Sequence, residues 1–305
     1  MDQIQAMRAF TRVVEAGTFT KAADSLSLPK ASVTKQIQAL ESRLQVKLLN
    51  RTTRRVTVTA DGAAYYERAS RLISDLDDIE ASMTNAQANP RGRLRVDVGA
   101  AIGSLVIVPA LSTFHDRYPD IQLDLGVGDR PVDLIGDNVD CVIRGGDLTE
   151  QFLVARRIGS LPFLNVASPD YLKRYGTPAH PGELEDGSHR AIHFFSSRTG
   201  RPFPHLYEKG GEKIELAGRY QLAVNESNAH TAAVLAGLGV TQCTTFVAAP
   251  HLASGALVEV LQGWTRPVLP IHVVYPPNRH LSAKVRAFVD WAAELFGKHP
   301  QLQGR

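Results

Sequence analysis

The chain has 305 residues, of which 44% are hydrophobic and 21% are charged, and its formal net charge is only +3. This length is about twice that of a usual domain and suggests two or three domains. The ordinary composition excludes wholesale disorder, a collagen-like chain and a coiled coil alone. Residues 1–59 hold 10 Lys and Arg against 4 Asp and Glu, or +6, and the remainder holds 24 against 27, or −3. A basic head on a mildly acidic body predicts that the head meets a polyanion.

Cysteine use and the absence of targeting patterns favour the cytoplasm. Cys141 and Cys243 are the only cysteines, which excludes a disulfide framework and fits a reducing compartment. Both lie among apolar residues without a neighbouring Lys or Arg, so we expect buried, inert thiols and not a redox switch. The first residues lack a secretory signal pattern, and the longest uncharged stretch, 98–115, is too broken to span a bilayer. We expect a cytoplasmic protein without a membrane partner.

Helical periodicity begins at the first residues. Ile4, Met7, Phe10 and Val14 recur at helical spacing and predict the buried face of a helix that ends near Gly17. Thr18 is placed to cap a second helix, and Pro29 suits the first turn of a third. The predicted buried faces of these two helices consist of Phe19, Ala22, Ala23 and Leu26, and of Val33, Ile37, Leu40 and Leu44.

Two short helices joined by a tight turn predict a helix-turn-helix, whose second helix enters the DNA major groove. The outward face of that helix is polar, and its predicted DNA contacts are Lys30, Ala31, Ser32, Thr34, Lys35 and Gln38. Small residues let the backbone approach DNA, while Gln38 or Lys35 can reach base edges or phosphates. The alternative is a solvated helix face, and this pattern alone does not separate the two interpretations.

The next segment, residues 51–59, alternates Val and Thr after a run rich in arginine. This alternation predicts a short β-ribbon, which beside a recognition helix is the wing of a winged helix. Arg51, Thr53, Arg54 and Arg55 are then predicted DNA contacts, with the arginines pairing with phosphates. The alternative places these arginines on a solvated hairpin.

These segments together resemble the LysR-type transcriptional regulators. The resemblance is carried by residues 17–23 (GTFTKAA), 32–37 (SVTKQI) with Leu40 and Glu41, 50–54 (NRTTR) and 59–62 (TADG). Gln45 departs from the family, which usually has Gly there, and a positive φ at Gln45 would store about 1 kcal/mol of strain. Leu49 and Thr34 stand where Phe and Ser are common.

From residue 60 to about residue 89 nothing after Gly62 interrupts a predicted linker helix. A heptad seam runs through Tyr65, Ala69, Leu72, Leu76, Ile79 and Met83. Such a seam packs either on its own chain or against a second copy. We favour a second copy, with Tyr65, Leu72, Leu76, Ile79 and Met83 as the dimerisation residues. A twofold dimer predicts a roughly palindromic DNA operator, and the family resemblance implies the same dimer, often paired into a tetramer.

Beyond the hinge at residues 89–92, strands and helices alternate, which predicts parallel α/β sheets. Strand patterns occupy 94–98, 121–127, 141–143 and 269–275, and a helix is expected from about residue 104 to Phe114. The last helix carries its apolar face on Val285, Phe288, Val289, Ala292 and Leu295, with Ser282 as the candidate cap.

The body also resembles the effector domain of LysR-type regulators, which is similar to periplasmic binding proteins with two α/β lobes around a cleft. Residues 140–146 (DCVIRGG), 224–229 (VNESNA) and 236–240 (AGLGV) carry this match. The resemblance implies a winged helix-turn-helix domain at 1–59, a linker helix at 60–89 and an effector domain at 90–305. Lobe one would then comprise about 91–161 and 267–297, and lobe two about 162–266.

Ligands in such folds sit at the carboxyl ends of strands and at helix N-termini. The residues that meet this condition and form our predicted effector site are Ser104, Arg144, Gly145, Asn225 and Ser227. Arg144 is the predicted partner of a carboxylate, so a small organic acid is the candidate effector. Alternatively Ser104 and Ser227 only cap helices and Arg144 forms a structural ion pair. Phe194 and Phe195 could line the cleft, although we favour a place in the core.

The sequence indicates no catalytic set, cofactor or metal site. It has no glycine-rich dinucleotide turn, phosphate loop or Gly-x-Ser-x-Gly elbow, and His189 and His193 lack a third ligand. We therefore predict a non-enzymatic, sequence-specific DNA-binding transcriptional regulator that responds to a small molecule bound between its lobes. Two alternatives stay open: an architectural DNA-binding protein without an effector, and an enzyme with a DNA-targeting head.

Overall fold

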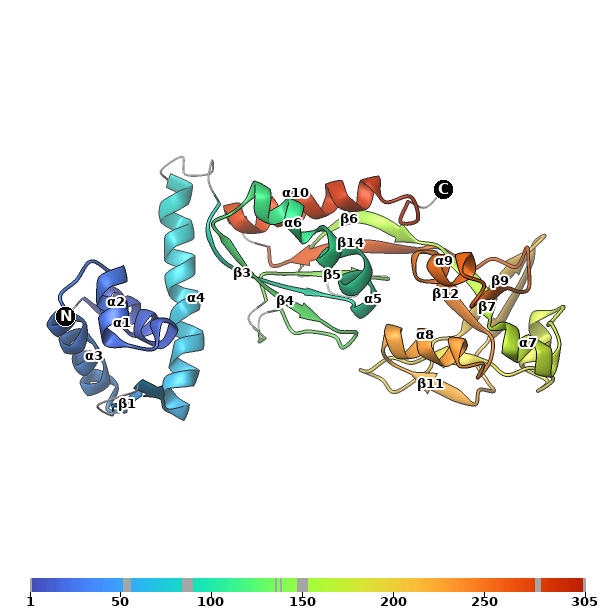
Figure 1. Cartoon of the computed structure of the whole chain (residues 1–305), viewed down its shortest axis with the longest axis horizontal. Coiled ribbons are helices and arrows are strands. Elements are labelled where there is room, and N and C mark those ends of the chain that lie inside the picture. Colours follow the sequence, from blue (N-terminus) through green and yellow to red (C-terminus); the bar gives the residue numbers. More distant parts are fainter. Residues whose placement is uncertain are drawn as a thin grey trace. The chain divides into compact units, whose positions relative to one another are not determined.

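The computed structural model describes residues 2–51, 56–83, 90–134, 136–137, 139–146, 153–277 and 281–303; for residues 51, 75 and 78–83 it describes the backbone alone. The chain divides into two compact units, Met1–Ala88 and Asn89–Arg305. Figure 1 labels the helices and strands of both units.

The N-terminal unit is a winged helix-turn-helix followed by a long helix. Its elements are α1 (Gln3–Ala16), α2 (Phe19–Ser25), α3 (Lys30–Leu44), the antiparallel pair β1 (Leu49–Arg51) and β2 (Val56–Val58), and α4 (Ala60–Met83). The predicted cap is present, because the Thr18 hydroxyl accepts a hydrogen bond from the Lys21 N–H at 3.2 Å. Helix α1 ends at Gly17, which has a φ of +69°.

The buried face of α1 differs from the predicted one. Its fully buried residues include Ala6, Ala9, Phe10 and Val13, whereas Ile4 is 38% exposed. Alanine lets neighbouring helices approach closely, and α1 contacts α2, α3 and α4. The alanine face of α1 therefore packs against the neighbouring helices, and the larger side chain of Ile4 lies partly in solvent.

Helix α3 ends at Leu44, directly before the position where the family usually has glycine. Val33, Ile37 and Leu40 are fully buried, and Gln45 closes the helix in the left-handed conformation with φ +55°. The Gln45 side-chain amide donates a hydrogen bond to the Ser42 carbonyl at 2.6 Å. A local bond thus accompanies a conformation that usually favours glycine.

Helix α4 belongs in part to the head's own core, so the predicted seam is not one continuous surface. The Tyr65 ring packs edge-on against Phe10, 5.6 Å between centroids, and Ala69 is only 4% exposed. Arg8 on α1 pairs with Asp77. By contrast Leu72 is 53% exposed. The seam therefore divides into a first part packed on α1 and a later part that carries an exposed leucine.

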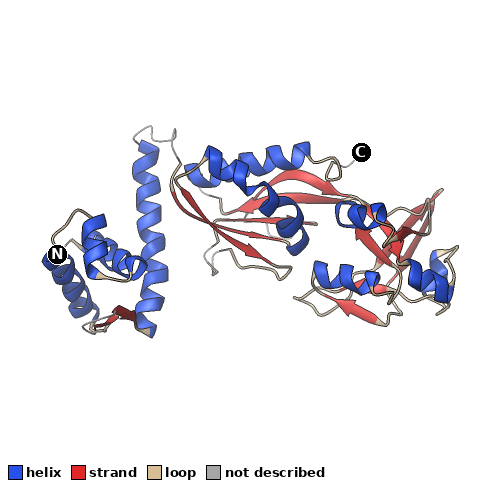
Figure 2. Cartoon of the chain, in the orientation of Figure 1, coloured by secondary structure: helices blue, strands red, loops and turns tan. Residues whose placement is uncertain are grey.

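A five-stranded sheet organises the beginning and end of the second unit. Its order is β4 (Ile121–Val127), β3 (Gly92–Val98), β5 (Cys141–Gly145), β14 (Leu269–Tyr275) and β6 (Val154–Leu161). Strand β3 is parallel to β4 and β5, but β14 is antiparallel to β5 and β6. The sheet is therefore mixed and not parallel as predicted, because β14 enters from the returning chain. Helices α6 (Val108–Arg117) and α10 (Ala283–Lys298) lie together on one side of it (Figure 2).

The middle of the second unit forms three smaller sheets. Strand β7 (Phe163–Ala167) lies between β12 (Thr241–Thr244) and β13 (Val258–Glu259), β8 (Ile192–Phe194) is parallel to β11 (Leu222–Val224), and β9 (His205–Lys209) pairs with β10 (Glu212–Leu216). Their helices are α7 (Pro169–Tyr175), the 3₁₀ helix η3 (Pro181–Leu184), α8 (Ser227–Leu235) and α9 (Thr245–Ala253). The chain leaves the large sheet after β6 and returns to it at β14.

The helix expected after Ser104 begins earlier. It starts at α5 (Ala100–Ile102), continues through a π-helical segment, η2 (Gly103–Ile107), and runs on as α6. Gly99 and Gly103 suggest a loop in the sequence, yet Gly103 is buried, and an added Cβ there would lie 2.8 Å from Val98. The second glycine is therefore needed for close packing and not for a break.

Both cysteines are free and buried, as predicted. Burial raises the pKa of both thiols, that of Cys243 to about 12. At α10 the Ser282 hydroxyl accepts from the Val285 N–H, and Val285, Phe288, Val289 and Ala292 are buried. No helix in the described part of the chain has the length and apolarity needed to span a bilayer.

Candidate functional site

The outward face of α3 presents polar side chains, and the opposite face buries Val33, Ile37 and Leu40 together with the carboxylate of Glu41. Lys30, Ala31, Lys35 and Gln38 are exposed, whereas Ser32 and Thr34 are half-buried. The Thr34 hydroxyl donates to the Lys30 carbonyl at 2.9 Å, which uses that hydroxyl inside the helix. Across the described residues, the structure records no side-chain hydrogen bond or ion pair for Lys30, Lys35 or Gln38. These three side chains are therefore available to a partner.

A buried carboxylate fixes the ribbon against α3. Glu41 is 5% exposed, and its Oε1 accepts hydrogen bonds from the Leu48 and Leu49 N–H groups at 2.9 and 3.2 Å. Sequence reasoning noticed Glu41 only as part of the resemblance, since a Glu in a polar helix carries no sign of burial. It joins the recognition helix to the first strand of the wing.

The ribbon itself is present, with Leu49 opposite Val58 and Arg51 opposite Val56. Of the predicted wing contacts, Thr53, Arg54 and Arg55 lie outside the described residues, as does the side chain of Arg51. The same holds for the side chains of Ile79 and Met83 on the seam.

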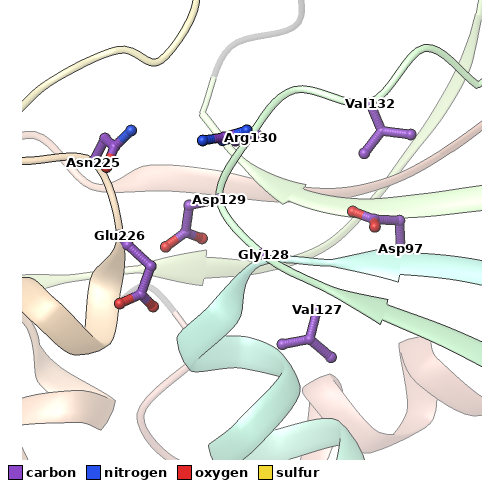
Figure 3. A pocket seen from close by; sticks show the side chains of 8 residues that line it. All are labelled: Asp97, Val127, Gly128, Asp129, Arg130, Val132, Asn225 and Glu226. Carbon is purple, nitrogen blue, oxygen red and sulfur yellow. The ribbon is translucent and has the colours of Figure 1, made fainter.

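In the second unit, two adjoining cavities open where strand ends meet the start of α8. The larger, of about 430 Å³, is lined by Asp97, Val127, Gly128, Asp129, Arg130, Val132, Asn225 and Glu226 (Figure 3). The smaller, of about 380 Å³, is lined by Arg130, Pro131, Phe195, Ser197, Arg198 and Asn225. Arg130 and Asn225 border both. The volume of each falls in the range of small-molecule sites.

One carboxylate satisfies two helix N-termini at this place. Asp129 follows β4, and its Oδ1 accepts from the Ala100 N–H at 2.9 Å. Its Oδ2 accepts from the Ser227 N–H at 2.6 Å and from the Ser227 hydroxyl. Free N–H groups at helix N-termini favour an anion, and here the anion is a side chain of the same protein.

Arg144 is also engaged within the chain. It forms an ion pair with Asp97 and donates to the carbonyls of Ile143 and Arg130 at 3.1 and 3.3 Å. Burial raises the pKa of the Asp97 carboxyl, and the neighbouring Arg144 opposes that rise. The structural ion pair, which was the alternative reading of Arg144, is therefore the one observed.

The remaining predicted effector residues lie in different settings. Ser104 is exposed within the helix, beyond its first turn, so it is not a cap. Gly145 ends β5, where an added Cβ would lie 2.5 Å from a Leu161 methyl. Ser227 begins α8 but does not cap it, because the Glu226 carboxylate accepts from the Asn228 and Ala229 N–H groups. Asn225 lines both cavities and donates to the Ser197 hydroxyl at 3.1 Å.

Sequence reasoning missed several lining residues. Asp97 and Asp129 lie at or just beyond the carboxyl ends of β3 and β4, a signal that the strand pattern already carried. Phe194 and Phe195 are half-buried, and Phe195 lines the smaller cavity, so the core position favoured for it is corrected. Arg130 and Arg198 lie in loops without a recognisable spacing.

The histidines form internal contacts. His189 shares a hydrogen bond with the Tyr171 hydroxyl at 3.2 Å, and the His193 ring stacks on His205 at 4.2 Å. Within the described ranges no group of three or more His, Cys, Asp or Glu side chains could hold a metal ion.

Comparisons with known proteins match both units. Residues 4–63 match the family model described as "Bacterial regulatory helix-turn-helix protein, lysR family", and residues 87–297 match the "LysR substrate binding domain". An HTH-type transcriptional repressor of Pseudomonas aeruginosa (strain UCBPP-PA14) is 41% identical over 303 residues, covering 99% of this chain and 95% of the relative. The uncharacterized HTH-type transcriptional regulator YhjC of Escherichia coli (strain K12) is 40% identical, covering 98% and 99%.

Solved structures agree with these matches. The full-length Vibrio cholerae virulence activator AphB has a TM-score of 0.58 at 28% identity, covering 95% of this chain and 98% of that one. CrgA of Neisseria meningitidis, a LysR-type transcriptional regulator, has a TM-score of 0.60 at 28% identity, covering 95% and 97%.

Proposed function

The chain belongs to the family of LysR-type transcriptional regulators, and we propose that it reads a roughly palindromic operator as a homodimer or tetramer under the control of a small organic acid. As a member of this family it combines a DNA-binding helix-turn-helix with an effector-binding domain. The operator symmetry, the oligomer and the acid are the new parts of this statement.

The DNA-reading part of the proposal is carried by the exposed polar face of α3, where Lys30, Lys35 and Gln38 have no recorded side-chain partner among the described residues. In the major groove Gln38 would read a base edge, and the lysines would contact phosphates or bases. Small or short side chains at Ala31, Ser32 and Thr34 would let the helix approach DNA closely. The wing residues Arg51, Thr53, Arg54 and Arg55 would hold the flanking phosphates.

The proposed dimer rests on the later part of α4. Leu72 is 53% exposed and Leu76 is half-buried, and Ile79 and Met83 continue the same seam in the sequence. Tyr65 has a different role from the predicted one, because it packs on Phe10 and holds α4 against the head. A second copy on Leu72 and Leu76 would cover this exposed apolar surface and set the spacing of two heads.

The effector would act by binding one arrangement of the assembly more tightly than another, since only differential affinity shifts such an equilibrium. The cavities of the second unit have the size for a small acid, and α4 is the element that would transmit the change. The two relatives described above are named as a transcriptional repressor and a transcriptional regulator, which favours a regulatory function over an enzymatic one.

Sedimentation tests the dimer. Leu76→Glu places a charge in the seam and should reduce the mass to that of one chain, whereas Ala64→Glu, on an exposed face of the same helix, should leave the mass unchanged. An unchanged mass for Leu76→Glu contradicts the proposed interface.

Operator binding tests the DNA contacts. Replacing Gln38 by Ala should remove about 1–3 kcal/mol of discrimination between bases at one position per half-site. Replacing Arg54 and Arg55 together by Ala should instead weaken binding to all sequences and reduce the slope of log affinity against log salt by up to about two. A uniform loss for Gln38→Ala would assign this helix to phosphate contact alone.

A further inference from the structure

We propose that the acid group of the effector is held by Arg130 and Arg198 in the smaller cavity, with Ser197 as a hydrogen-bond donor and the Phe195 ring against an apolar, flat body. This assignment rests on the proposed function, in which a small organic acid binds the second unit. It moves the acid away from the helix N-termini and from Arg144, where sequence reasoning expected it.

The N–H groups at the two helix N-termini already have a hydrogen-bond acceptor. The Asp129 carboxylate accepts hydrogen bonds from the Ala100 N–H, the Ser227 N–H and the Ser227 hydroxyl. It thus serves as acceptor for the first N–H group of the 100–117 helix and of α8. A tethered group competes at an effective concentration on the order of millimolar or higher. A free acid at micromolar concentration would therefore not displace it.

Arg144 is occupied in the same way. Its guanidinium pairs with Asp97 and also donates to two carbonyls. An acid that recruited Arg144 would have to leave the half-buried Asp97 carboxylate without its partner, which is costly for a buried charge.

The charge of the larger cavity also disfavours an anion. Its lining includes three acidic side chains, Asp97, Asp129 and Glu226, against a single arginine, Arg130. In Figure 3 Arg130 extends from the loop after β4, and Asn225 from the turn before α8. An incoming carboxylate is repelled by like charges at short range, so it would settle on the side of Arg130 that faces the smaller cavity.

The smaller cavity offers the opposite charge. Arg130 and Arg198 both line it, and the lining contains no acidic residue. Across the described residues neither guanidinium has a recorded ion pair or side-chain hydrogen bond. A guanidinium binds a carboxylate through two parallel N–H donors, so a pair of arginines favours an acid over a neutral ligand.

Two further residues define the rest of the ligand. Ser197 accepts a hydrogen bond from the Asn225 amide, which leaves the Ser197 O–H to donate to an acid oxygen. Phe195 and Pro131 supply apolar surface in the same cavity. A carboxylate attached to a flat apolar group, such as an aromatic acid, uses all of these contacts.

The position of the two arginines would also connect binding to regulation. Arg130 follows β4 of the five-stranded sheet, whereas Arg198 lies in the turn after β8 of a smaller sheet. An acid bound by both would join these segments and favour the arrangement that brings them together.

Calorimetric titration of the full-length protein with benzoate tests this assignment, with benzamide as the neutral analogue and acetate as the analogue without a ring. Benzamide should bind at least about tenfold more weakly than benzoate. Arg130→Gln and Arg198→Gln should each weaken benzoate binding by about tenfold or more. Arg201→Gln is the matched control, since Arg201 is exposed in the neighbouring segment and lines neither cavity. Phe195→Ala should weaken benzoate but not acetate.

Several results overturn the assignment. No benzoate binding, equal binding of benzamide, or unchanged affinity in both arginine variants would each do so. Tighter benzoate binding in Asp129→Ala that no longer depends on the arginines would move the site to the helix N-termini. Asp129→Asn is the second variant, because it keeps the side-chain size if Asp129→Ala does not fold.

The same preparations, titrated with the protein's own upstream DNA and with random DNA, separate the two levels of the account. Specific DNA binding without benzoate binding overturns the acid site and leaves the regulator intact. Wild-type protein without DNA specificity contradicts the proposed function, whatever benzoate does.

Discussion

The head and the second unit of this protein treat their polar side chains in opposite ways. On α3, Lys30, Lys35 and Gln38 are exposed and unengaged within the described chain, while the buried Glu41 carboxylate of the same helix accepts hydrogen bonds from two backbone N–H groups. Around the cavities of the second unit, Asp129 and Arg144 are paired inside the protein.

This difference fits the partner that we propose for each surface. DNA is a large polyanion that meets an exposed face, so the reading side chains need no partner beforehand. A small-molecule site is partly enclosed, and charged groups there are costly unless they are paired. Its free donors are therefore few, and among the described residues of the smaller cavity they are the guanidinium groups of Arg130 and Arg198 and the O–H of Ser197.

The largest expected change in stability comes from removing the buried Glu41 carboxylate of the head. Glu41→Ala leaves the Leu48 and Leu49 N–H groups without their acceptor, which should cost about 4 kcal/mol of unfolding free energy. Chemical denaturation measures it. Gln38→Ala on the same helix is the control and should change stability by less than about 0.5 kcal/mol. Equal stability of both variants would mean that Glu41 is not the anchor of the wing.

Acid should destabilise the second unit through its buried histidines. Burial lowers the pKa of His193, His205 and His230, that of His230 to about 4. The positive charge of the nearby Arg266 lowers the pKa of His205 further. The unfolded chain then binds more protons, so stability is full above pH 6.5 and falls as the pH drops toward 4. His230 alone should account for about 3 kcal/mol of that loss.

Urea unfolding between pH 7.5 and pH 4.5 measures this loss. His230→Gln should make the dependence of stability on pH less steep than in the wild type. A wild-type protein whose stability rises or stays constant as the pH falls over this range contradicts the assignment of buried, neutral histidines.

Removing the Asp129 carboxylate should lower stability by a smaller amount. Asp129→Ala removes one acceptor from two helix N-termini and should lower the unfolding free energy of the second unit by about 2 kcal/mol. Amide hydrogen exchange at Ala100 and Ser227 should accelerate in this variant. Unchanged exchange at both amides would show that water replaces the carboxylate without loss.

The smallest effect should come from the end of α3. Gln45→Gly relieves the positive φ of +55° and should stabilise the head by up to about 1 kcal/mol. The lost bond to Ser42 offsets part of this gain. Gly17→Ala, at a φ of +69°, is the opposite change and should destabilise by a similar amount. Thermal unfolding measures both, and destabilisation by Gln45→Gly would give the Ser42 bond the larger weight.

The sequence reveals much of the head because its signals are local. A cap such as Thr18, a stop such as Gly17 and the spacing of Val33, Ile37 and Leu40 each act within one helix. Where packing between elements decides, the prediction shifts: Ala6 and Ala9 replace Ile4 on the buried face of α1, and Tyr65 joins the core of its own head.

The cavities depend on contacts between residues far apart in the chain, and local patterns do not contain them. Asp129 meets Ser227 and Asp97 meets Arg144 only after the sheets have formed. The rule that ligands lie at strand ends and helix starts selected Asn225, which lines both cavities, but it could not tell which donors already have partners within the protein.

The central claim is that the protein binds its own operator specifically and responds to a small acid. The most direct test is its affinity for its own upstream DNA and for random DNA at one fixed salt concentration, with and without benzoate. We predict a ratio of affinities of roughly a thousand or more that changes when benzoate is added. Equal affinity for both DNAs, unchanged by benzoate, would contradict the account and favour an architectural DNA-binding protein.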